Sequence, residues 1–509
     1  MNQSETSPLA ARIRALASAQ TDKPCITFQD IQARSTFSPE QMWAMIEQIT
    51  AHLSAAGLKH GDRLAWLSLN HVTQLAALIA CARIGAIWVP LNFRLATPEL
   101  QQVIADAQPK LLVTDDLHLS VAQQLGVEAS NVVLMAHLLE STRLDLESEP
   151  LKGRANDPLL LVYTSGTTGR AKGAVHTQQA LMNNASASHW AHDFSPDDVV
   201  LSTLPMFHVG GLCIQTLPAW LAGASVILHA RFEPALWLHE VEASRPTLSL
   251  LVPATLRAVI EHPSWACADL SSLRGIMTGS SVVPRAFIEA FHARGVPVGQ
   301  VYGTTETGPV SIALKLHEAM ACVGSAGKAH PNATLQLLDE HGNPVPQGLV
   351  GEIAIQADNL MAGYWNASGQ MGVGLEDGWF RSGDLGMIES TGRLTVVGRN
   401  KDMIISGGEN IYPAEIENHL VAMAGIVECA VVGLPDAKWG EVPVLTVVKT
   451  KDAVGVALQD HDIQAYLQAR VARYKLPKKV VFLDTLPKSA LGKVLKPQLR
   501  DLLLASEWQ

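Results

Sequence analysis

The sequence predicts an α/β protein. A large N-terminal domain would hold mostly parallel sheets flanked by helices plus a small barrel-like β region, and a small α+β C-terminal domain would follow. Apolar runs alternate with helical segments up to about residue 330, then short runs with glycine and asparagine turns appear, and a mixed unit begins near residue 400. Alternating strands and helices favour parallel sheets, whereas short runs joined by tight turns favour antiparallel hairpins.

The first helix signal covers residues 38–57. Ser38 is suited to cap the helix, Pro39 to fill its first position, and Gln41 to complete a capping box. Gly57 suits the end of the helix. The apolar residues that share one face are Met42, Met45, Ile46, Ile49 and Leu53.

Residues 62–91 carry the clearest parallel unit. A strand-like run, a helical segment over 72–85 and a second strand-like run over 86–91 follow one another. A strand, a crossover helix and another strand imply parallel pairing. Further runs with the composition of buried strands cover 109–115, 158–164, 224–229, 247–252, 273–279 and 298–303.

The pattern changes after residue 330. Short strands with glycine and asparagine turns are expected at 333–345, 351–357 and 378–399. Beyond Asn400, helical and strand-like segments mix. The charged segment 398–402 is the predicted boundary, so we expect an N-terminal domain over 1–398, a hinge over 399–402 and a C-terminal domain over 403–509.

Composition excludes several classes of protein. The chain has 509 residues, is 48% hydrophobic, and carries a formal net charge of −10 without a dominant basic block, so we expect no nucleic-acid partner. Its six cysteines are dispersed and form no C-x-x-C pair, which disfavours a disulfide framework. No signal peptide or membrane-length apolar run is visible, so a cytoplasmic location without a stable membrane span is expected.

Residues 163–173, YTSGTTGRAKG, follow an apolar run and combine three glycines with four serine and threonine hydroxyls, an arginine and a lysine. Backbone N–H groups, hydroxyls and cations in such a loop can wrap phosphates. Taken alone, the segment could equally be a solvated surface loop. It does not match the nucleotide-binding pattern G-x-x-x-x-G-K-[ST], because the residue after Lys172 is Gly173 and not serine or threonine. This mismatch disfavours a kinase- or GTPase-type loop.

Further stretches follow in order. They are YGTTET at 302–307, WFRSGDLG at 379–386 with Asp384 expected in a turn between strands, the segment 398–417, and PKSALGKVLK at 487–496. Together with the first loop they resemble the adenylate-forming (ANL) superfamily of acyl-CoA synthetases, adenylation domains and luciferases. The resemblance spans nearly the whole chain. One departure is Ala171, where the family often has proline before the lysine.

The resemblance implies an AMP-forming acid–thiol ligase. A carboxylate would attack the α-phosphate of Mg·ATP to give an acyl-adenylate, and the thiol of coenzyme A would then displace AMP. ATP, Mg²⁺ and CoA are the implied cofactors and co-substrates, and a carboxylic acid is the implied small-molecule partner. Alternatives are a stand-alone adenylation enzyme that loads a carrier protein, a luciferase-like oxygenase, or a non-catalytic nucleotide-binding protein. A homodimer is one assembly open to such a chain.

The resemblance also implies roles for individual residues. Thr305 would contact the α-phosphate and Glu306 would bind Mg²⁺, which accepts few carboxylates beside phosphate and water. Tyr302 would pack on adenine, while Asp384 and Arg399 would bind the ribose. The residues implied to hold the β- and γ-phosphates are Thr164, Ser165, Gly166, Thr167, Thr168, Gly169 and Lys172. Taken singly, Tyr302 could be a core aromatic and Asp384 an ordinary turn residue; the ordered set favours function.

The C-terminal residues complete the implied site. Lys493 would reach the substrate carboxylate and the α-phosphate during adenylation. The C-terminal domain would rotate about Lys401, after which Gly407 and Gly408 would leave room for the pantetheine arm of CoA. As alternatives, Lys493 could be a solvated surface lysine and Lys401 an exposed linker residue.

The segment PMFHVGGLC, residues 205–213, lies where the family lines its acyl pocket. His208 would be a gate or wall, although a hydrogen-bonded core histidine is an equal alternative. Gly210 and Gly211 would favour a roomy slot. The region resembles ligases for medium- or long-chain fatty acids and for hydroxycinnamic or benzoic acids. It carries no arginine for a second carboxylate, which disfavours dicarboxylates such as malonate.

Overall fold

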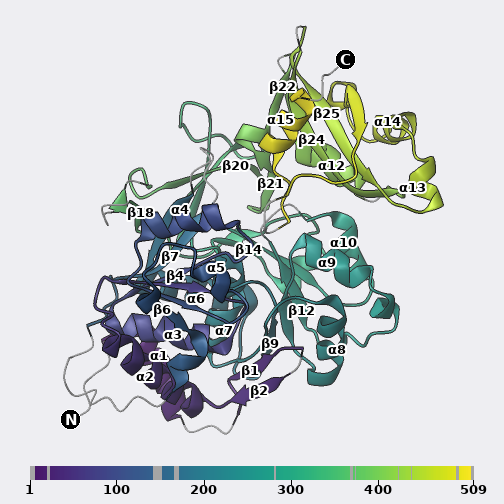
Figure 1. The fold of residues 1–509 in the computed structure, drawn as a ribbon. Helices are drawn as coiled ribbons and strands as arrows, with labels where there is room; N and C mark the ends of the chain where they lie inside the picture. Colours follow the sequence, from purple (N-terminus) through teal and green to yellow (C-terminus); the bar gives the residue numbers. More distant parts are fainter. Residues whose placement is uncertain are drawn as a thin grey trace.

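The computed structural model has a large N-terminal body and a smaller C-terminal lobe (Figure 1). It describes residues 6–19, 23–31, 33–140, 152–164, 171–279, 283–366, 371–372, 374–407, 409–421, 423–436, 438–488 and 492–505. None of the helices in these ranges combines the length and the apolar character that a membrane span requires.

The first sheet of the body has eight strands in the order β19-β18-β8-β7-β4-β3-β5-β6. The predicted parallel unit is confirmed, because β3 and β4 pair in parallel on either side of helix α3. The strands are β3 (Arg63–Leu67), β4 (Ile87–Pro90), β5 (Leu111–Thr114), β6 (Val132–Leu134), β7 (Pro158–Thr164), β8 (Lys172–Thr177), β18 (Gly363–Trp365) and β19 (Met371–Gly372).

The second sheet has nine strands in the order β15-β14-β13-β12-β11-β9-β10-β1-β2. Its centre is parallel and its edges are antiparallel. The strands are β1 (Ile26–Gln29), β2 (Arg34–Phe37), β9 (Val199–Ser202), β10 (Ser225–His229), β11 (Leu248–Leu250), β12 (Gly275–Thr278), β13 (Val298–Tyr302), β14 (Ile312–Leu314) and β15 (Lys328–Ala329).

Helices cover both sheets. They are α1 (Pro8–Ser18), α2 (Pro39–Ala55), α3 (Val72–Ile84), α4 (Thr97–Ala107), α5 (Leu119–Ala122), α6 (Gln178–His192), α7 (Leu217–Ala222), α8 (Pro234–Ser244), α9 (Pro253–Ile260), α10 (Arg285–His292) and α11 (Leu316–Ala319). The predicted first strong helix is α2, whose Ser38 and Gln41 form the expected capping box. Buried Trp66, Trp88 and Trp220 anchor the core shared by these layers. Each large aromatic ring removes much apolar surface from water.

The third sheet is antiparallel, as predicted, and contains β16 (Ala333–Leu338), β17 (Val350–Ala357), β20 (Phe380–Ile388) and β21 (Leu394–Arg399). The expectation that Asp384 lies in a turn is wrong, because β20 continues through it. Leu385 pairs with Glu352 and Arg381 with Ala354, so β20 has extra residues at this point and bulges. Gly383 adopts φ 71° within the bulge. Bulges re-aim side chains, and Asp384 lies within this one.

The C-terminal lobe mixes helices with a five-stranded sheet, as predicted. Its strands are β22 (Ile404–Ser406), β23 (Glu409–Ile411), β24 (Ile426–Asp436), β25 (Gly440–Lys449) and β26 (Lys479–Phe482), and its helices are α12 (Pro413–Leu420), α13 (Ala453–Ala457), α14 (Asp460–Gln468) and α15 (Lys496–Ala505). Arg257 in α9 of the body donates a hydrogen bond to the carbonyl oxygen of Val427 in β24. This contact joins the lobe to the body.

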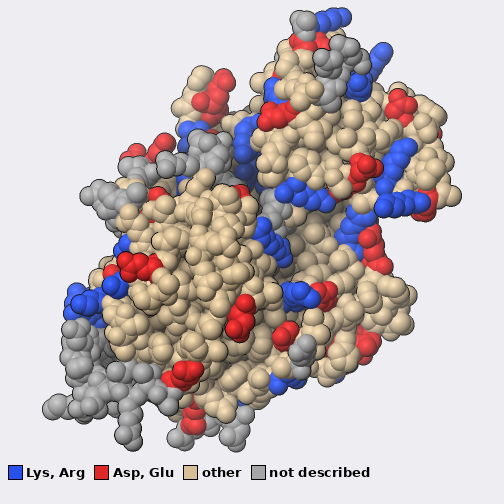
Figure 2. All heavy atoms as spheres, viewed as in Figure 1, with Lys and Arg blue, Asp and Glu red and all other residues tan. Residues whose placement is uncertain are grey.

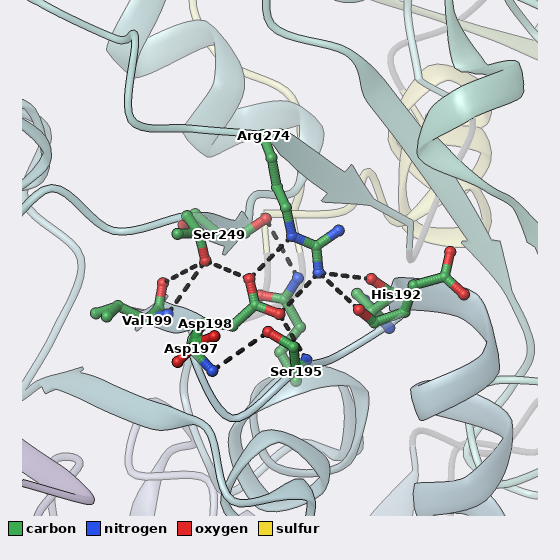
Figure 3. A network of polar contacts seen from close by, with 10 residues as sticks. His192, Ser195, Asp197, Asp198, Val199, Ser249 and Arg274 are labelled. Carbon is green, nitrogen blue, oxygen red and sulfur yellow. Dashed lines mark hydrogen bonds and ion pairs between the residues drawn. The ribbon is translucent and has the colours of Figure 1, made fainter. Parts of the chain in front are cut away.

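An ion pair made on the buried carboxylate of Asp198 ties several segments of the body together (Figure 3). Arg274 donates to Asp198 from Nε (2.9 Å) and Nη2 (3.0 Å), and Nη2 also donates to the carbonyl oxygen of His192 at the end of α6. Thr247 Oγ1 and the Ser195 N–H donate to the same carboxylate. Burial alone would raise the pKa of Asp198, but the Arg274, Thr247 and Ser195 hydrogen bonds outweigh it and lower the pKa.

We expect Arg274→Ala to lower the free energy of unfolding by about 2–3 kcal/mol, because it leaves the Asp198 carboxylate buried without its cation. Since the native pKa of Asp198 is depressed, the stabilisation should be complete above about pH 4 and fall as pH drops through the native pKa. Urea unfolding monitored between pH 7 and pH 3 tests this.

The control for Arg274→Ala is Arg231→Ala. Arg231 pairs with Glu233, but both side chains are largely exposed, so this substitution should change stability by under about 0.5 kcal/mol. Equal effects of the two substitutions would contradict the assignment of the Asp198–Arg274 pair as a buried tie.

Candidate active site

The predicted phosphate loop connects β7 and β8, which pair antiparallel. Thr164 and Lys172 are cross-strand partners at the two ends of the loop, and Thr164 Oγ1 lies 3.4 Å from the Lys172 carbonyl oxygen. Five of the predicted phosphate ligands lie outside the described residues: Ser165, Gly166, Thr167, Thr168 and Gly169. The two described members therefore mark the base of the loop.

The turn after β13 carries Thr305 and Glu306, and three contacts hold it. His176 of β8 is fully buried, and its Nε2 lies 2.8 Å from the Thr305 carbonyl oxygen. Burial lowers the pKa of His176 to about 4, so the neutral ring donates this hydrogen bond from Nε2. Tyr364 donates its hydroxyl proton to Glu306 Oε1 at 2.9 Å, and the Met361 N–H donates to the Glu306 carbonyl oxygen.

A second cluster joins Tyr302, Asp384 and Arg399. The Tyr302 hydroxyl donates to Asp384 Oδ2 at 2.9 Å, and Arg399 Nε lies 2.9 Å from Asp384 Oδ1. Burial, with the Asp384 charge, raises the pKa of Tyr302, so its hydroxyl remains a donor. Three residues that the sequence separates by nearly a hundred positions therefore form one site. A carboxylate beside an arginine can accept hydroxyl protons, as the predicted ribose site requires.

Lys493 lies near this second cluster. The residue as a whole is exposed, yet burial around its ammonium group lowers the pKa to about 8. The Arg399 charge lowers the pKa further, and the Asp384 and Asp402 carboxylates oppose this. The C-terminal lobe thus brings a cation to the edge of the Tyr302–Asp384–Arg399 cluster. Figure 2 shows lysine and arginine side chains along the hollow between the lobe and the body.

Lys401 and Gly407 lie at the start of the C-terminal lobe, in η5 and directly after β22. Lys401 is exposed in the short 3₁₀ helix η5 (Asn400–Asp402). Gly407 adopts φ 60°, and a Cβ atom there would lie 2.6 Å from the Trp439 ring, so glycine is required in this arrangement. Lys438 and Lys478 approach the face of the same ring, with Nζ 4.9 Å and 5.7 Å from its centroid. Gly408 lies outside the described residues.

The predicted acyl-pocket segment forms a π-helix over Gly210–Thr216, a rare conformation that recurs at functional sites. His208 precedes it and accepts the Gly210 N–H at Nδ1, and burial lowers the pKa of His208 to about 4. Gly211 does not open a slot, because a Cβ atom there would lie 2.2 Å from the Pro205 carbonyl oxygen. Close backbone packing explains this glycine.

The apolar cluster beside the π-helix brings several elements together. Its buried members are Ala187, Ala191, Leu204, Ile214, Leu250, Met277, Val301, Val310 and Ala313. Trp190 packs at its edge and meets His330 in an edge-on contact with ring centroids 5.4 Å apart. Thr278 ends β12 fully buried. Trp190 is the aromatic side chain that packs against this apolar cluster.

The donor set suits one magnesium ligand. Among the described residues, no three His, Cys, Asp or Glu side chains gather into a metal-binding group. Glu306 supplies one carboxylate in a turn otherwise rich in threonine. Mg²⁺ is commonly bound by one or two carboxylates together with substrate phosphates and water, so the residues present fit an ion that arrives with ATP.

Sequence reasoning missed Tyr364 and His176. Tyr364 lies in GYW, 58 positions after Glu306, and only the pairing of β18 with β8 brings it to the turn. His176 lies four residues after Lys172 in an apolar strand. A polar residue within a buried strand was the available signal, since buried polar groups need a partner.

Comparison with known proteins agrees with this geometry. The family model of the AMP-binding enzyme matches residues 13–365, and that of the AMP-binding enzyme C-terminal domain matches residues 415–493. The chain is 45% identical to an indoleacetate–CoA ligase from Aromatoleum aromaticum, over 91% of this chain and 92% of that protein. It is 40% identical to a feruloyl-CoA synthase from Amycolatopsis sp, over 89% and 91%.

Solved structures agree as well. The o-succinylbenzoate CoA synthetase from Bacillus subtilis, in complex with its acyl-adenylate intermediate, superposes with a TM-score of 0.85 at 29% identity and covers 96% of this chain and 98% of its own. The same enzyme is also known in complex with ATP and a magnesium ion. The relatives named here are acid–CoA ligases, and each matches most of the length of this chain. The chain belongs to the AMP-binding enzyme family, as its ordered motifs predicted.

Proposed function

We propose that the protein is an ATP-dependent acid–CoA ligase acting through an acyl-adenylate, and that its acid is aromatic. The observation that carries the proposal is the approach of Lys493, from the C-terminal lobe, to the Tyr302–Asp384–Arg399 cluster of the body. The AMP-forming acid–CoA ligase class is shared by the relatives at 36–45% identity. A cytoplasmic location and a homodimer stay predictions.

Each cluster has a part in the first half-reaction. Lys172 and the loop 164–169 would hold the β- and γ-phosphates, and Thr305 the α-phosphate. Asp384 and Arg399 would hold the ribose, and Tyr302 would lie against adenine. A carboxylate oxygen of the acid forms a bond to the α-phosphorus, and the bond to the pyrophosphate oxygen breaks. Lys493 would stabilise the negative charge shared by these oxygens.

Glu306 would bind the Mg²⁺ of Mg·ATP, and that ion supplies charge neutralisation at the phosphate oxygens. In the second half-reaction the CoA sulfur forms a bond to the acyl carbon, and the bond to the AMP oxygen breaks. Gly407 and Gly408 would then line the path of the thiol. Trp439 with Lys438 and Lys478 offers an aromatic face and two cations to the nucleotide end of CoA.

The first half-reaction occurs at the α-phosphorus and the second at the acyl carbon beside it, so they need different groups around one acyl substrate, which supports a moving C-terminal domain. We propose the boundaries 1–398, 399–402 and 403–509, with Lys401 as the hinge. The influence of Arg399 and Asp384 on Lys493 supports an arrangement of the adenylating kind. The Arg257–Val427 hydrogen bond would stabilise this state and break on rotation.

The more similar relatives favour an aromatic acid over a fatty acid. The indoleacetate and feruloyl enzymes are 45% and 40% identical, whereas the long-chain-fatty-acid–CoA ligase FadD13 of Mycobacterium tuberculosis is 36% identical. The Trp190–His330 contact beside the π-helix supports the same choice, since aromatic rings favour edge-on and offset packing. His208 would be a wall of this pocket.

We expect arylacetic and hydroxycinnamic acids to release pyrophosphate from ATP and to form thioesters only when CoA is present. Long-chain fatty acids and malonate should react at least about tenfold more slowly. A poor fit to the acyl pocket weakens transition-state binding by about 1–3 kcal/mol. A pyrophosphate-release screen with and without CoA measures this. Preferential turnover of palmitate would overturn the aromatic assignment, and pyrophosphate release without thioester formation would point to a carrier-protein acceptor.

Lys493→Ala should slow adenylation by about 10²–10³-fold while ATP still binds, because one positioned charge is lost. Since the pKa of Lys493 is lowered to about 8, its charge is lost as pH rises through 8, and kcat/KM for ATP should fall there. Lys493→Arg should remove this fall, because arginine stays charged. Stopped-flow pyrophosphate release from pH 6.5 to pH 9.5 tests both variants. If Lys493→Arg has the same pH profile as the wild type, the Lys493 charge is not the group that titrates, and its proposed role in adenylation is refuted.

Arg257→Ala should slow adenylation about fivefold, because a hydrogen bond from a charged group at a partly exposed contact contributes about 1 kcal/mol. Thioester formation from supplied acyl-adenylate and CoA should not slow. The matched control is Arg285→Ala, which removes an exposed i,i+4 pair with Glu289 in α10. Equal slowing of both half-reactions by Arg257→Ala would argue against a state-specific contact.

A further inference from the structure

Tyr364 contacts two groups of the proposed ATP site at once. Its hydroxyl donates to Glu306 Oε1 at 2.9 Å. The Nζ atom of Lys172 lies 5.1 Å from the centroid of its ring, within cation–π distance. One side chain therefore touches both the proposed metal ligand and the proposed phosphate lysine.

The backbone around Tyr364 is fixed by regular pairing. Gly363 pairs with Val175 and Tyr364 with Ala174, so β18 lies in register beside the strand that begins at Lys172. The Ala362 N–H donates to the Val175 carbonyl oxygen. The Met361 N–H donates to the Glu306 carbonyl oxygen at 2.8 Å, so β18 is also tied to the turn. The position of the ring follows from these bonds rather than from a mobile loop.

The hydroxyl of Tyr364 is a permanent donor. A tyrosine phenol has an ordinary pKa of about 10, so it is protonated at neutral pH, and the 2.9 Å contact with Glu306 Oε1 is one in which it donates. A carboxylate has two oxygens with about four acceptor sites. The phenol takes one acceptor site of Oε1, and the other acceptor sites of the carboxylate can serve a further ligand.

We propose that Tyr364 is a positioning residue that orients the Glu306 carboxylate for the metal of Mg·ATP and holds Lys172 beside the same phosphates. This inference rests on the proposed function. Residues that orient a metal ligand commonly change metal affinity or activity by about 10–100-fold when replaced. Tyr364 acts through Glu306 and Lys172, and it is a separate group from both.

Tyr364→Phe tests the inference because it removes one oxygen atom and keeps the ring. We expect the Mg²⁺ concentration that half-saturates ATP binding to rise about tenfold, measured by calorimetry at fixed ATP. ATP affinity in EDTA should stay within twofold of wild type, because the ring and Lys172 remain. A thermal unfolding scan confirms that the variant is folded.

Tyr163→Phe is the matched control. The Tyr163 hydroxyl also donates to a carboxylate, that of Asp106, at 2.6 Å, and burial likewise raises the pKa of Tyr163. Tyr163 lies in strand β7 before the implied phosphate ligands, and its hydroxyl bonds to Asp106 of α4, so this substitution should change stability but leave the Mg²⁺ dependence of ATP binding as in wild type. A similar Mg²⁺ shift in both variants would mean that the effect is general loosening, and the inference would fail.

A double substitution shows whether Tyr364 acts through Glu306. In a Glu306→Gln background, Tyr364→Phe should produce no further Mg²⁺ shift, since the oriented carboxylate is already absent. The inference about Tyr364 would fail if Tyr364→Phe still produced a tenfold Mg²⁺ shift in the Glu306→Gln background. It would also fail if Tyr364→Phe had the Mg²⁺ dependence of the wild type. Either result would leave the proposed function standing. Loss of metal-dependent ATP binding in the wild-type protein would instead overturn the proposed function and this inference with it.

Discussion

Two cations from different parts of the chain lie around a single carboxylate at the junction of the body and the C-terminal lobe. Arg399 pairs directly with Asp384, and the Lys493 ammonium lies close enough for both to influence it. Burial and the like charge of Arg399 disfavour a protonated Lys493, while the Asp384 and Asp402 carboxylates favour it. A bound anion would favour the protonated form of Lys493, as the proposed nucleotide site requires.

The rest of the site depends on strands that hold their neighbours in register. The antiparallel pairing of β7, β8 and β18 brings the base of the proposed phosphate loop, His176 and Tyr364 to the turn with Thr305 and Glu306. The bulge in β20 directs Asp384 toward Tyr302. Polar groups positioned by sheet ladders need little reorganisation when charge develops, and this is the physical basis of preorganised catalysis.

Two glycines of the proposed site are required by close packing within the protein. Gly211 lies against the Pro205 backbone and Gly407 against the Trp439 ring, so in both places a larger side chain would collide with the protein itself. A glycine in a motif therefore does not by itself indicate space for a ligand. In the present arrangement of the lobe, the Trp439 ring fills the space beside Gly407. That space could admit a ligand only in another arrangement of the lobe.

The sequence by itself determined the α/β architecture, the capped helix α2, the first parallel unit and membership of the AMP-binding enzyme family. These follow from local composition, hydrophobic periodicity and ordered motifs, which are all written along the chain. Only the tertiary structure decided that Asp384 lies in a bulge, that Tyr364 reaches Glu306, that His176 holds Thr305 and that the pKa of Lys493 is lowered. Each of these depends on strand register or on burial among distant segments, and neither quantity can be read from neighbouring residues.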